Sequence, residues 1–337
     1  MNRFAREAAA ALLALAAALL VGGLFVAARG HPLGEVYATW FGDALFTPGG
    51  RAQVVFKATT LIATGLAALL AFRAGLFNIG AEGQLYGGCF AAALAALALP
   101  PELPGAIAQP LVVLAALAGG ALVALVPAWL RASRGASEVI TTMMMNFVAT
   151  AGVNAALGLV RESPDVVRTA SVPGLWRFPR MERGFDGSAA IVVVIGAALV
   201  VGHVLARMRL GFWIDTLGAR RSVAVASGHP VRRVELGVLV ASGALAGLGG
   251  VNFVLGSPGY FEQGFAPGQG FLGIAVALVA RNDPLALVPA AFAFALLAEG
   301  AQSLQTLAPP ELGLIVQALT VIGVLVASRA LAAKHRG

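Results

Sequence analysis

The sequence is poor in charge. Only 12% of its 337 residues are charged, against about 25% in a soluble domain. In contrast, 59% are hydrophobic and the mean hydropathy is +0.85. Water cannot solvate a surface of this composition, so lipid must cover much of it. This scarcity excludes an ordinary soluble enzyme and predicts an integral membrane protein.

Groups that carry catalysis or bind metals are also scarce. Cys89 is the sole cysteine, which excludes an internal disulfide, and the four histidines are scattered. There is no GxxxxGK[ST] phosphate loop and no HExxH zinc motif. The chain therefore does not hydrolyse ATP by that route, and we expect no catalytic residue, no metal and no cofactor in it.

The excess of positive charge does not indicate nucleic acid. The net charge is +7 and the isoelectric point is about 10.7. The arginines lie in loops between apolar segments, and no basic stripe carries interleaved aromatics. We expect them to meet anionic lipid headgroups and to orient the chain in the membrane.

Apolar segments of spanning or near-spanning length follow one another along the whole chain. They run at 8–28, 54–72, 83–99, 107–129, 138–160, 189–207, 236–256, 270–281, 285–305 and 312–329. The first is longer than the core of a signal peptide and predicts a retained helix. The segment 270–281 is too short to span alone and is typical of a re-entrant helix. The fold class is therefore all-α and membrane-integral, with about ten transmembrane helices.

Arginine and lysine set the expected orientation. With the N-terminus inside and ten crossings, 15 of the 23 basic residues lie on the cytoplasmic side, as the positive-inside rule requires. Both termini are then cytoplasmic. The aromatic stretch 35–46 predicts a helix at the outer interface. The loop 207–235 is the largest cytoplasmic one, and it is too apolar for a free linker, which predicts a short docking helix.

Two glycine-broken segments occupy similar places, FNIGAEGQ at 77–84 and FAPGQGF at 265–271. The helices before them run in opposite directions in this topology, which is typical of inverted repeats in transporters. A broken helix exposes backbone groups that are tolerated in a membrane only beside a cavity or inside protein. The candidate solute-path residues are accordingly Asn78, Glu82, Gln84, Asn146, Gln269 and Phe271.

Other roles remain open for some of these residues. Glu82 heads an apolar segment, where a helix dipole also favours a carboxylate. Asn146 needs either a ligand or a neighbouring helix as its partner. The glycines Gly243, Gly247 and Gly250 favour close helix packing instead.

The domain organisation predicted is one transmembrane domain over 1–337. Its parts are a first helix and outer loop (1–53), a first repeat (54–160), an outer loop, sixth helix and cytoplasmic loop (161–235) and a second repeat (236–330).

Three stretches carry a resemblance. FRAGLFNIGAEGQLYGG at 72–88, SEVITTMMMNFVA at 137–149 and the run 242–280 resemble permease subunits of bacterial ATP-binding-cassette importers for nucleosides and simple sugars. The resemblance implies about ten helices with inverted repeats in the bacterial inner membrane. It implies as partners ATPase subunits that use the ATP, an extracytoplasmic binding protein and a second permease, here in a heterodimer.

The same resemblance places the segment that contacts the ATPase. It corresponds to 218–228, with Gly218, Arg220, Arg221, Ala224 and Gly228 as the coupling residues. The sequence departs from the family pattern, which has Arg-Ala near Asp215 and Asn-Pro near Arg220.

The function expected is solute import by alternating access, with nucleosides as the first choice of solute and ribose-type sugars as the second. An ion-driven secondary transporter also has inverted repeats and broken helices. A membrane enzyme or a polytopic scaffold is a third possibility. The absence of a nucleophile motif and of paired catalytic carboxylates argues against the enzyme.

Overall fold

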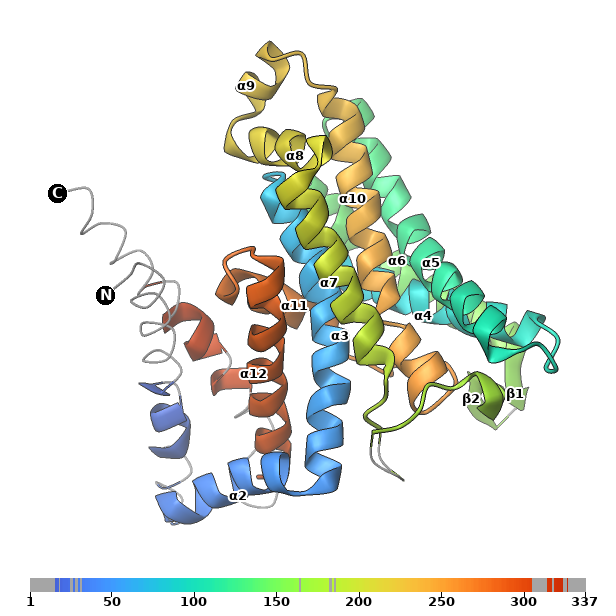
Figure 1. The fold of residues 1–337 in the computed structure, drawn as a ribbon, viewed down its shortest axis with the longest axis vertical. Helices are drawn as coiled ribbons and strands as arrows, with labels where there is room; N and C mark the ends of the chain where they lie inside the picture. Colours follow the sequence, from blue (N-terminus) through green and yellow to red (C-terminus); the bar gives the residue numbers. More distant parts are fainter. Residues whose placement is uncertain are drawn as a thin grey trace. The chain divides into compact units, whose positions relative to one another are not determined.

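The computed structural model describes residues 16–17, 19–24, 27, 30, 32–163, 165–181, 184, 186–304, 314–316, 318–323 and 326. The chain divides into two compact units (Figure 1). One comprises 1–55 with 292–337, and the other comprises 56–291. Most of the predicted segment 8–28 and part of the predicted segment 312–329 lie outside the described residues.

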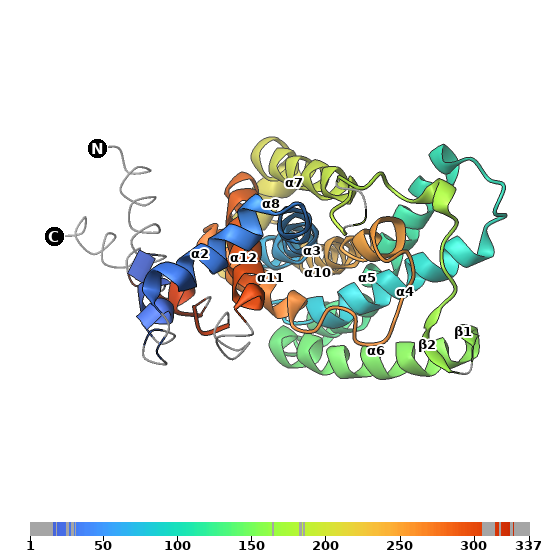
Figure 2. The same ribbon diagram turned by 90° about the horizontal axis from the view of Figure 1, so that it is seen from below.

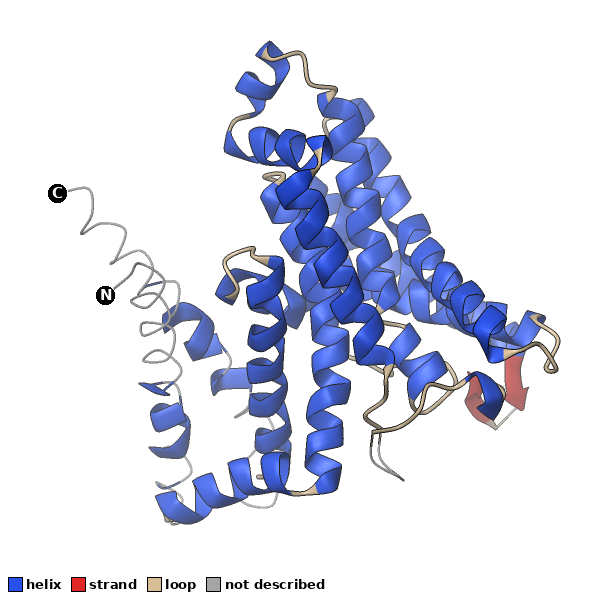
Figure 3. Cartoon of the chain, viewed as in Figure 1, coloured by secondary structure: helices blue, strands red, loops and turns tan. Residues whose placement is uncertain are grey.

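Helices make up nearly all the regular structure (Figure 3). They are α2 (Leu33–Phe46), α3 (Pro48–Arg73), α4 (Ala81–Ala98), α5 (Gly105–Arg134), α6 (Glu138–Val160), α7 (Ala190–Arg207), α8 (Arg209–Ala219), α9 (Arg221–Ala226), α10 (Val231–Leu248), α11 (Gln269–Val279) and α12 (Pro284–Ser303). Two short turns add to them, the 3₁₀ turn η1 (Gly174–Trp176) and the π-helical turn η2 (Asn252–Gly256).

The all-α fold class is confirmed, and one small element adds to it. A small antiparallel hairpin, β1 (Arg161–Ser163) and β2 (Val166–Thr169), interrupts the loop after α6. The loop is polar and leaves the helical bundle, so its backbone groups pair with each other instead of within a helix.

Six helices in the described residues are long and apolar enough to cross a membrane. They are α3, α5, α6, α7, α10 with its extension to Gly256, and α12. This confirms the multi-pass helical membrane fold, while the full count of about ten and the inverted repeats stay predictions. The short segment expected near 270–281 is α11, which has only 11 residues.

Glycines bring α4, α5 and α10 into backbone contact. A Cβ built on Gly120 of α5 would lie 2.2 Å from the carbonyl oxygen of Gly243 on α10. One built on Gly88 of α4 would lie 2.3 Å from Gly247 Cα. Small residues permit this approach in membrane helices, which confirms the packing role predicted for Gly243 and Gly247. Seen from below, α4 runs beside α5 and α6 (Figure 2).

The loop 207–235 folds into α8 and α9, so the predicted helix is in fact a pair of helices. They lie at one end of the 56–291 unit, and the β1–β2 hairpin lies at the other (Figure 1).

In the other unit, the helix predicted over 35–46 is present as α2, and its place at the outer interface stays a prediction. Its Val36 and Trp40 are fully buried, packed with Leu297, Ala301 and Val316.

Candidate functional site

The two glycine-broken segments meet in the structure. Residues 74–80 lead from α3 into α4, and Gly268 precedes α11 with a φ of +80°. A Cβ on Gly270 would lie 2.3 Å from the backbone nitrogen of Glu82, so the backbones touch. Thr64 of α3 also donates a hydrogen bond to the Gln269 carbonyl at 3.1 Å. The structure therefore brings together the two segments that the sequence pairs.

Glu82 caps the second break. Its carboxylate accepts hydrogen bonds from the backbone N–H groups of Gly268 at 2.7 Å and Gly270 at 2.6 Å. These donors start α11 and have no partner within the helix, and the helix dipole favours a negative charge there. Glu82 lies in the first turn of its own helix, α4, as the dipole interpretation suggests. Its carboxylate also caps the N-terminus of a second helix, α11.

Asn146 of α6 caps the first break in the same way. Its amide oxygen accepts from the Gly83 N–H, and its amide nitrogen donates to the Ile79 carbonyl, both at 2.9 Å. One turn earlier, the Ile79 N–H donates to the Thr142 hydroxyl at 3.2 Å. Asn146 therefore has a neighbouring segment as its partner.

Asn78 and Gln84 form a reciprocal amide pair. Asn78 donates to Gln84 at 2.7 Å and to the Ser242 hydroxyl at 2.7 Å, while its oxygen accepts from Gln84 at 3.0 Å and from the Gly80 N–H at 2.9 Å. Both side chains are 1% exposed. These contacts use the polar atoms of Asn78 inside the chain, so in this conformation it holds the break in shape.

A cavity of about 240 Å³ opens beside Glu82. It lies between α4, α6 and the segment before α11, lined by Glu82, Leu85, Tyr86, Thr150, Asn154, Gln263, Gly264, Phe265, Ala266 and Pro267. The Tyr86 ring stacks on Phe265 with centroids 5.4 Å apart and an interplanar angle of 4°. The Tyr86 hydroxyl donates to Asn154 Oδ1 at 2.7 Å and accepts from the Gly264 N–H at 3.2 Å.

Sequence reasoning missed Tyr86, Asn154, Gln263 and Phe265. A helical spacing could have found two of them, because Tyr86 lies four residues after Glu82 and Asn154 eight residues after Asn146. Phe265 opens the glycine-broken segment 265–271, whereas nothing local in the sequence marks Gln263. An aromatic wall with a few convergent amide and carboxylate groups is the usual lining of a small-molecule site.

Of the six predicted solute-path residues, Glu82 alone lines this cavity. The Gln269 amide oxygen is buried, with no hydrogen-bond partner in the described part of the chain. Phe271 is 45% exposed on α11.

A larger cavity of about 570 Å³ lies between α7, α8 and α10. Its lining is apolar apart from Arg233 and the indole of Trp213. A polar solute would lose its hydrogen bonds to water there without replacing them, so it does not suit such a solute.

The predicted coupling residues occupy different environments. Gly218 lies against the backbone of Arg73, where a Cβ would be 2.1 Å from the carbonyl oxygen. Ala224 is fully buried, Gly228 has a φ of +72°, and Arg220 is exposed. Arg221 donates to Glu235 of α10 at 3.0 Å, and this hydrogen bond and ion pair raise the pKa of its guanidinium.

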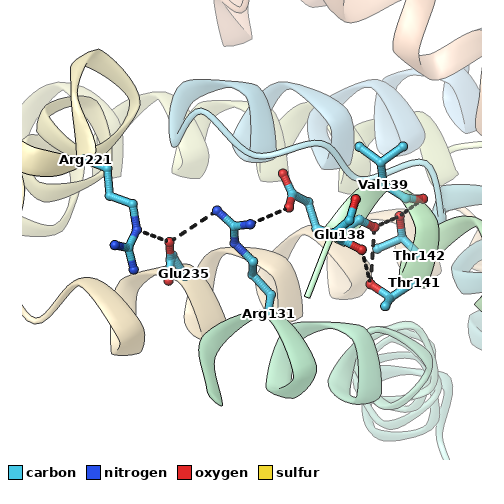
Figure 4. Close-up of polar contacts among 8 residues, drawn as sticks. Arg131, Glu138, Val139, Thr141, Thr142, Arg221 and Glu235 are labelled. Atoms are coloured by element: carbon cyan, nitrogen blue, oxygen red, sulfur yellow. Dashed lines mark hydrogen bonds and ion pairs between the residues drawn. The ribbon is translucent and has the colours of Figure 1, made fainter. Parts of the chain in front are cut away.

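That ion pair belongs to a chain of four charges (Figure 4). Arg131 of α5 lies 3.0 Å from Glu138 of α6 and 3.7 Å from Glu235. Four elements, α9, α10, α5 and α6, are thereby joined at the end of the unit that carries α9.

Residues 50–325 match the family described as the branched-chain amino acid transport system permease component. The chain belongs to this family. It is 34% identical to the glucose ABC transporter permease TsgB13 of Haloferax volcanii, over 92% of this chain and 85% of that protein. It is 30% identical to the nucleoside ABC transporter permease NupB of Lactococcus lactis, over 97% of this chain and 93% of that protein.

A third relative, the guanosine ABC transporter permease NupP of Bacillus subtilis, is 32% identical over 83% of this chain and 81% of its own length. The same bacterium has a second guanosine permease, NupQ, which is also similar to this chain. Family membership makes this chain an ABC transporter permease and a transport subunit without catalytic function. ATP is used by a separate ATPase, which decides against an ion-driven secondary transporter.

Proposed function

We propose that this permease imports a nucleoside or a related small polar solute, and that the 240 Å³ cavity is part of the path. The observation that carries the proposal is the stacked Tyr86–Phe265 wall beside Asn154 and Glu82. Stacking suits a flat nucleobase, whereas the amide of Asn154 and the carboxylate of Glu82 suit ribose hydroxyls. Three of the relatives above are named as nucleoside or guanosine permeases.

A simple sugar is the second candidate. One relative is named as a glucose permease, and an aromatic face with a carboxylate and an amide also suits a hexose. The two candidates differ in what the aromatic wall contributes. A nucleobase needs the ring surface for stacking, whereas a sugar depends more on the hydrogen-bonding groups.

The proposed assembly contains a second permease in a heterodimer, ATPase subunits and an extracytoplasmic binding protein. Pairing of two permeases is supported by NupP and NupQ, both similar to this chain within one bacterium. The exposed Val223 and Val225 give α9 an apolar surface for the ATPase. The chain would then lie in the inner membrane with both termini on the cytoplasmic side and the β1–β2 hairpin on the outer side.

The proposed mechanism is alternating access. The binding protein delivers solute at the hairpin end, and ATP binding in the ATPase moves α8 and α9. The helices around the cavity then open it toward the cytoplasm. This chain makes and breaks no covalent bond, and contributes a path with two conformations.

The test is uptake into proteoliposomes that contain the complete transporter, its binding protein and internal ATP. Labelled guanosine, cytidine, ribose and glucose are compared. We expect ATP-dependent nucleoside uptake, a severalfold higher KM for Asn154→Ala, and a comparable effect of Phe265→Ala. Glucose uptake alone would transfer the proposal to the sugar branch. Unchanged uptake of every transported solute in both variants would remove the cavity from the path.

A further inference from the structure

Four charged side chains form an unbranched sequence of contacts from α9 to α6. Arg221 contacts Glu235 at 3.0 Å, Glu235 contacts Arg131 at 3.7 Å, and Arg131 contacts Glu138 at 3.0 Å (Figure 4). Two arginines and two glutamates balance in charge. Each comes from a different helix, so a shift of one helix changes the electrostatics of the next.

The two carboxylates differ in their need for a cation. The Glu235 side chain is 1% exposed and that of Glu138 is 10% exposed. A buried carboxylate without a partner is strongly unfavourable, because neither water nor another charge compensates it. Glu235 therefore requires at least one arginine in every conformation, whereas Glu138 is closer to water.

Arg131 is the only member that touches both carboxylates, among the residues the structure describes. It is closer to Glu138 while Arg221 holds Glu235. Arg221 is the most exposed of the four, with 56% of its side chain accessible, and it sits on the short helix α9. Of the three contacts, the Arg221–Glu235 contact is therefore the one that a movement of α9 breaks first.

Glu138, the last of the four charged residues, is connected through α6 to the cavity. Thr142 hydrogen-bonds the Glu138 carbonyl at 2.6 Å and holds the Ile79 N–H, and Asn146 holds the start of α4. Thr150 and Asn154, further along α6, line the cavity. The position of α6 thus sets both the first break and one cavity wall.

We propose that Arg131 is a positioning residue that exchanges carboxylates during transport. When α9 moves and withdraws Arg221, the buried Glu235 takes Arg131 and Glu138 is released. α6 then loses its ion pair with α5 and moves relative to α10, which changes the cavity. The inference rests on the proposed docking of the ATPase at α9.

The first experiment measures coupling in the reconstituted transporter. Glu138→Gln removes the charge that Arg131 exchanges but keeps the size of the side chain. Arg232→Gln is the control, because Arg232 is an exposed arginine of α10 at the same end. We expect Glu138→Gln to lower uptake per ATP hydrolysed by about 2- to 30-fold, with normal co-purification of the ATPase. The control should match the parent transporter.

The second experiment follows the helices directly. Cys89 is fully buried, so spin labels react selectively with cysteines placed at exposed positions. One pair, Ile140→Cys on α6 and Ala241→Cys on α10, reports α6. A second pair, Ala226→Cys on α9 with Ala241→Cys, reports α9. Distances are compared without nucleotide and with ATP trapped by a hydrolysis-deficient ATPase.

We expect both distances to change on ATP binding in the parent. In Glu138→Gln, the α9 distance should still change, whereas the α6 distance should already sit at its ATP-bound value without nucleotide. An α6 response identical to that of the parent would overturn the exchange. A missing α9 response in the parent, or an ATPase that binds without α9, would instead overturn the proposed docking, so the two failures are distinguishable.

Discussion

At the scale of single residues, the polar side chains of the broken segments divide into two groups. Asn78, Gln84 and Asn146 hold backbone or each other, and Tyr86 and Asn154 face the cavity. Glu82 belongs to both groups, because it caps α11 and lines the cavity. Substitutions should separate stability from transport along this division.

Asn146 and Asn154 form a matched pair on one helix. Asn146→Ala leaves the Gly83 N–H and the Ile79 carbonyl unpaired in a buried place, at about 1–3 kcal/mol for each. We expect a clear drop in Tm of the purified transporter. Asn154→Ala removes one acceptor of the Tyr86 hydroxyl and should change KM with little effect on Tm. Equal Tm values in the two variants would contradict the division.

The sequence indicated which polar residues matter at the breaks, but it did not indicate which groups they contact. The composition of FNIGAEGQ marks a break with polar groups, and its position after a spanning helix predicts that the break meets protein. It does not say that Asn146 serves Gly83 or that Glu82 serves Gly268, because a capping side chain on one helix has no fixed spacing from a helix elsewhere in the chain. The cavity residue Gln263 was missed for the same reason.

At the scale of helices, the contact of α5 with α10 depends on missing side chains. A Cβ on Gly247 would lie 2.4 Å from the Ala116 carbonyl oxygen, whereas one on Gly237 of the same helix meets nothing within 4 Å. Gly247→Ala must push backbones apart and should destabilise the protein by about 1–3 kcal/mol. Gly237→Ala should be neutral or stabilising by up to about 1 kcal/mol, because alanine favours helix.

Thermal unfolding of the two variants checks this prediction. Both changes add one methyl group to α10, so lipid and detergent effects are matched. If Gly237→Ala destabilised the protein as much as Gly247→Ala, close backbone contact would not be the reason that α10 carries glycine at these positions.

The contact between α8 and the end of α3 gives a second prediction at this scale. Arg73 forms a two-point ion pair with Asp215, at 2.8 and 2.6 Å. Both side chains are about one-third exposed or more, so the pair adds only about 0–1 kcal/mol to stability. Its fork geometry instead fixes orientation.

We therefore expect Arg73→Glu and Asp215→Arg each to reduce coupled uptake severalfold with little change in Tm. The double exchange should recover part of the activity, because it restores an ion pair of opposite direction. Uptake per ATP hydrolysed in reconstituted transporter is the measurement. A double variant as defective as the worse single one would show that the pair does not position α8.

Helix positions were the part of the fold that hydropathy predicted well. The segments expected at 138–160 and 189–207 correspond closely to α6 and α7, whereas α3 begins earlier than the expected segment 54–72. The pair α8 and α9 was expected as one helix, because the turn at Arg220 carries neither glycine nor proline. The hairpin was not expected at all, since strands of three and four residues leave almost no periodic pattern.

At the scale of the whole molecule, orientation is the property that charge counting predicts and that labelling can test. Ser227 follows α9, and Asp165 lies in the turn of the hairpin; both are exposed. With Cys89 buried, Ser227→Cys and Asp165→Cys give single reactive thiols. In right-side-out vesicles, a membrane-impermeant thiol reagent should label Asp165→Cys at once and Ser227→Cys only after permeabilisation. The reverse pattern would invert the topology.

The side chain of Asn78, whose polar atoms all have hydrogen-bond partners, bears on how well the membrane insulates. A helix break inside a bilayer invites a thread of water, along which protons pass. Here the polar atoms of Asn78 are already bound to Gln84, Ser242 and Gly80, so a water molecule would gain no bond there. We therefore expect little proton leakage past Asn78 in the resting permease, and a cell that keeps many copies of it would lose little of its membrane potential at this break.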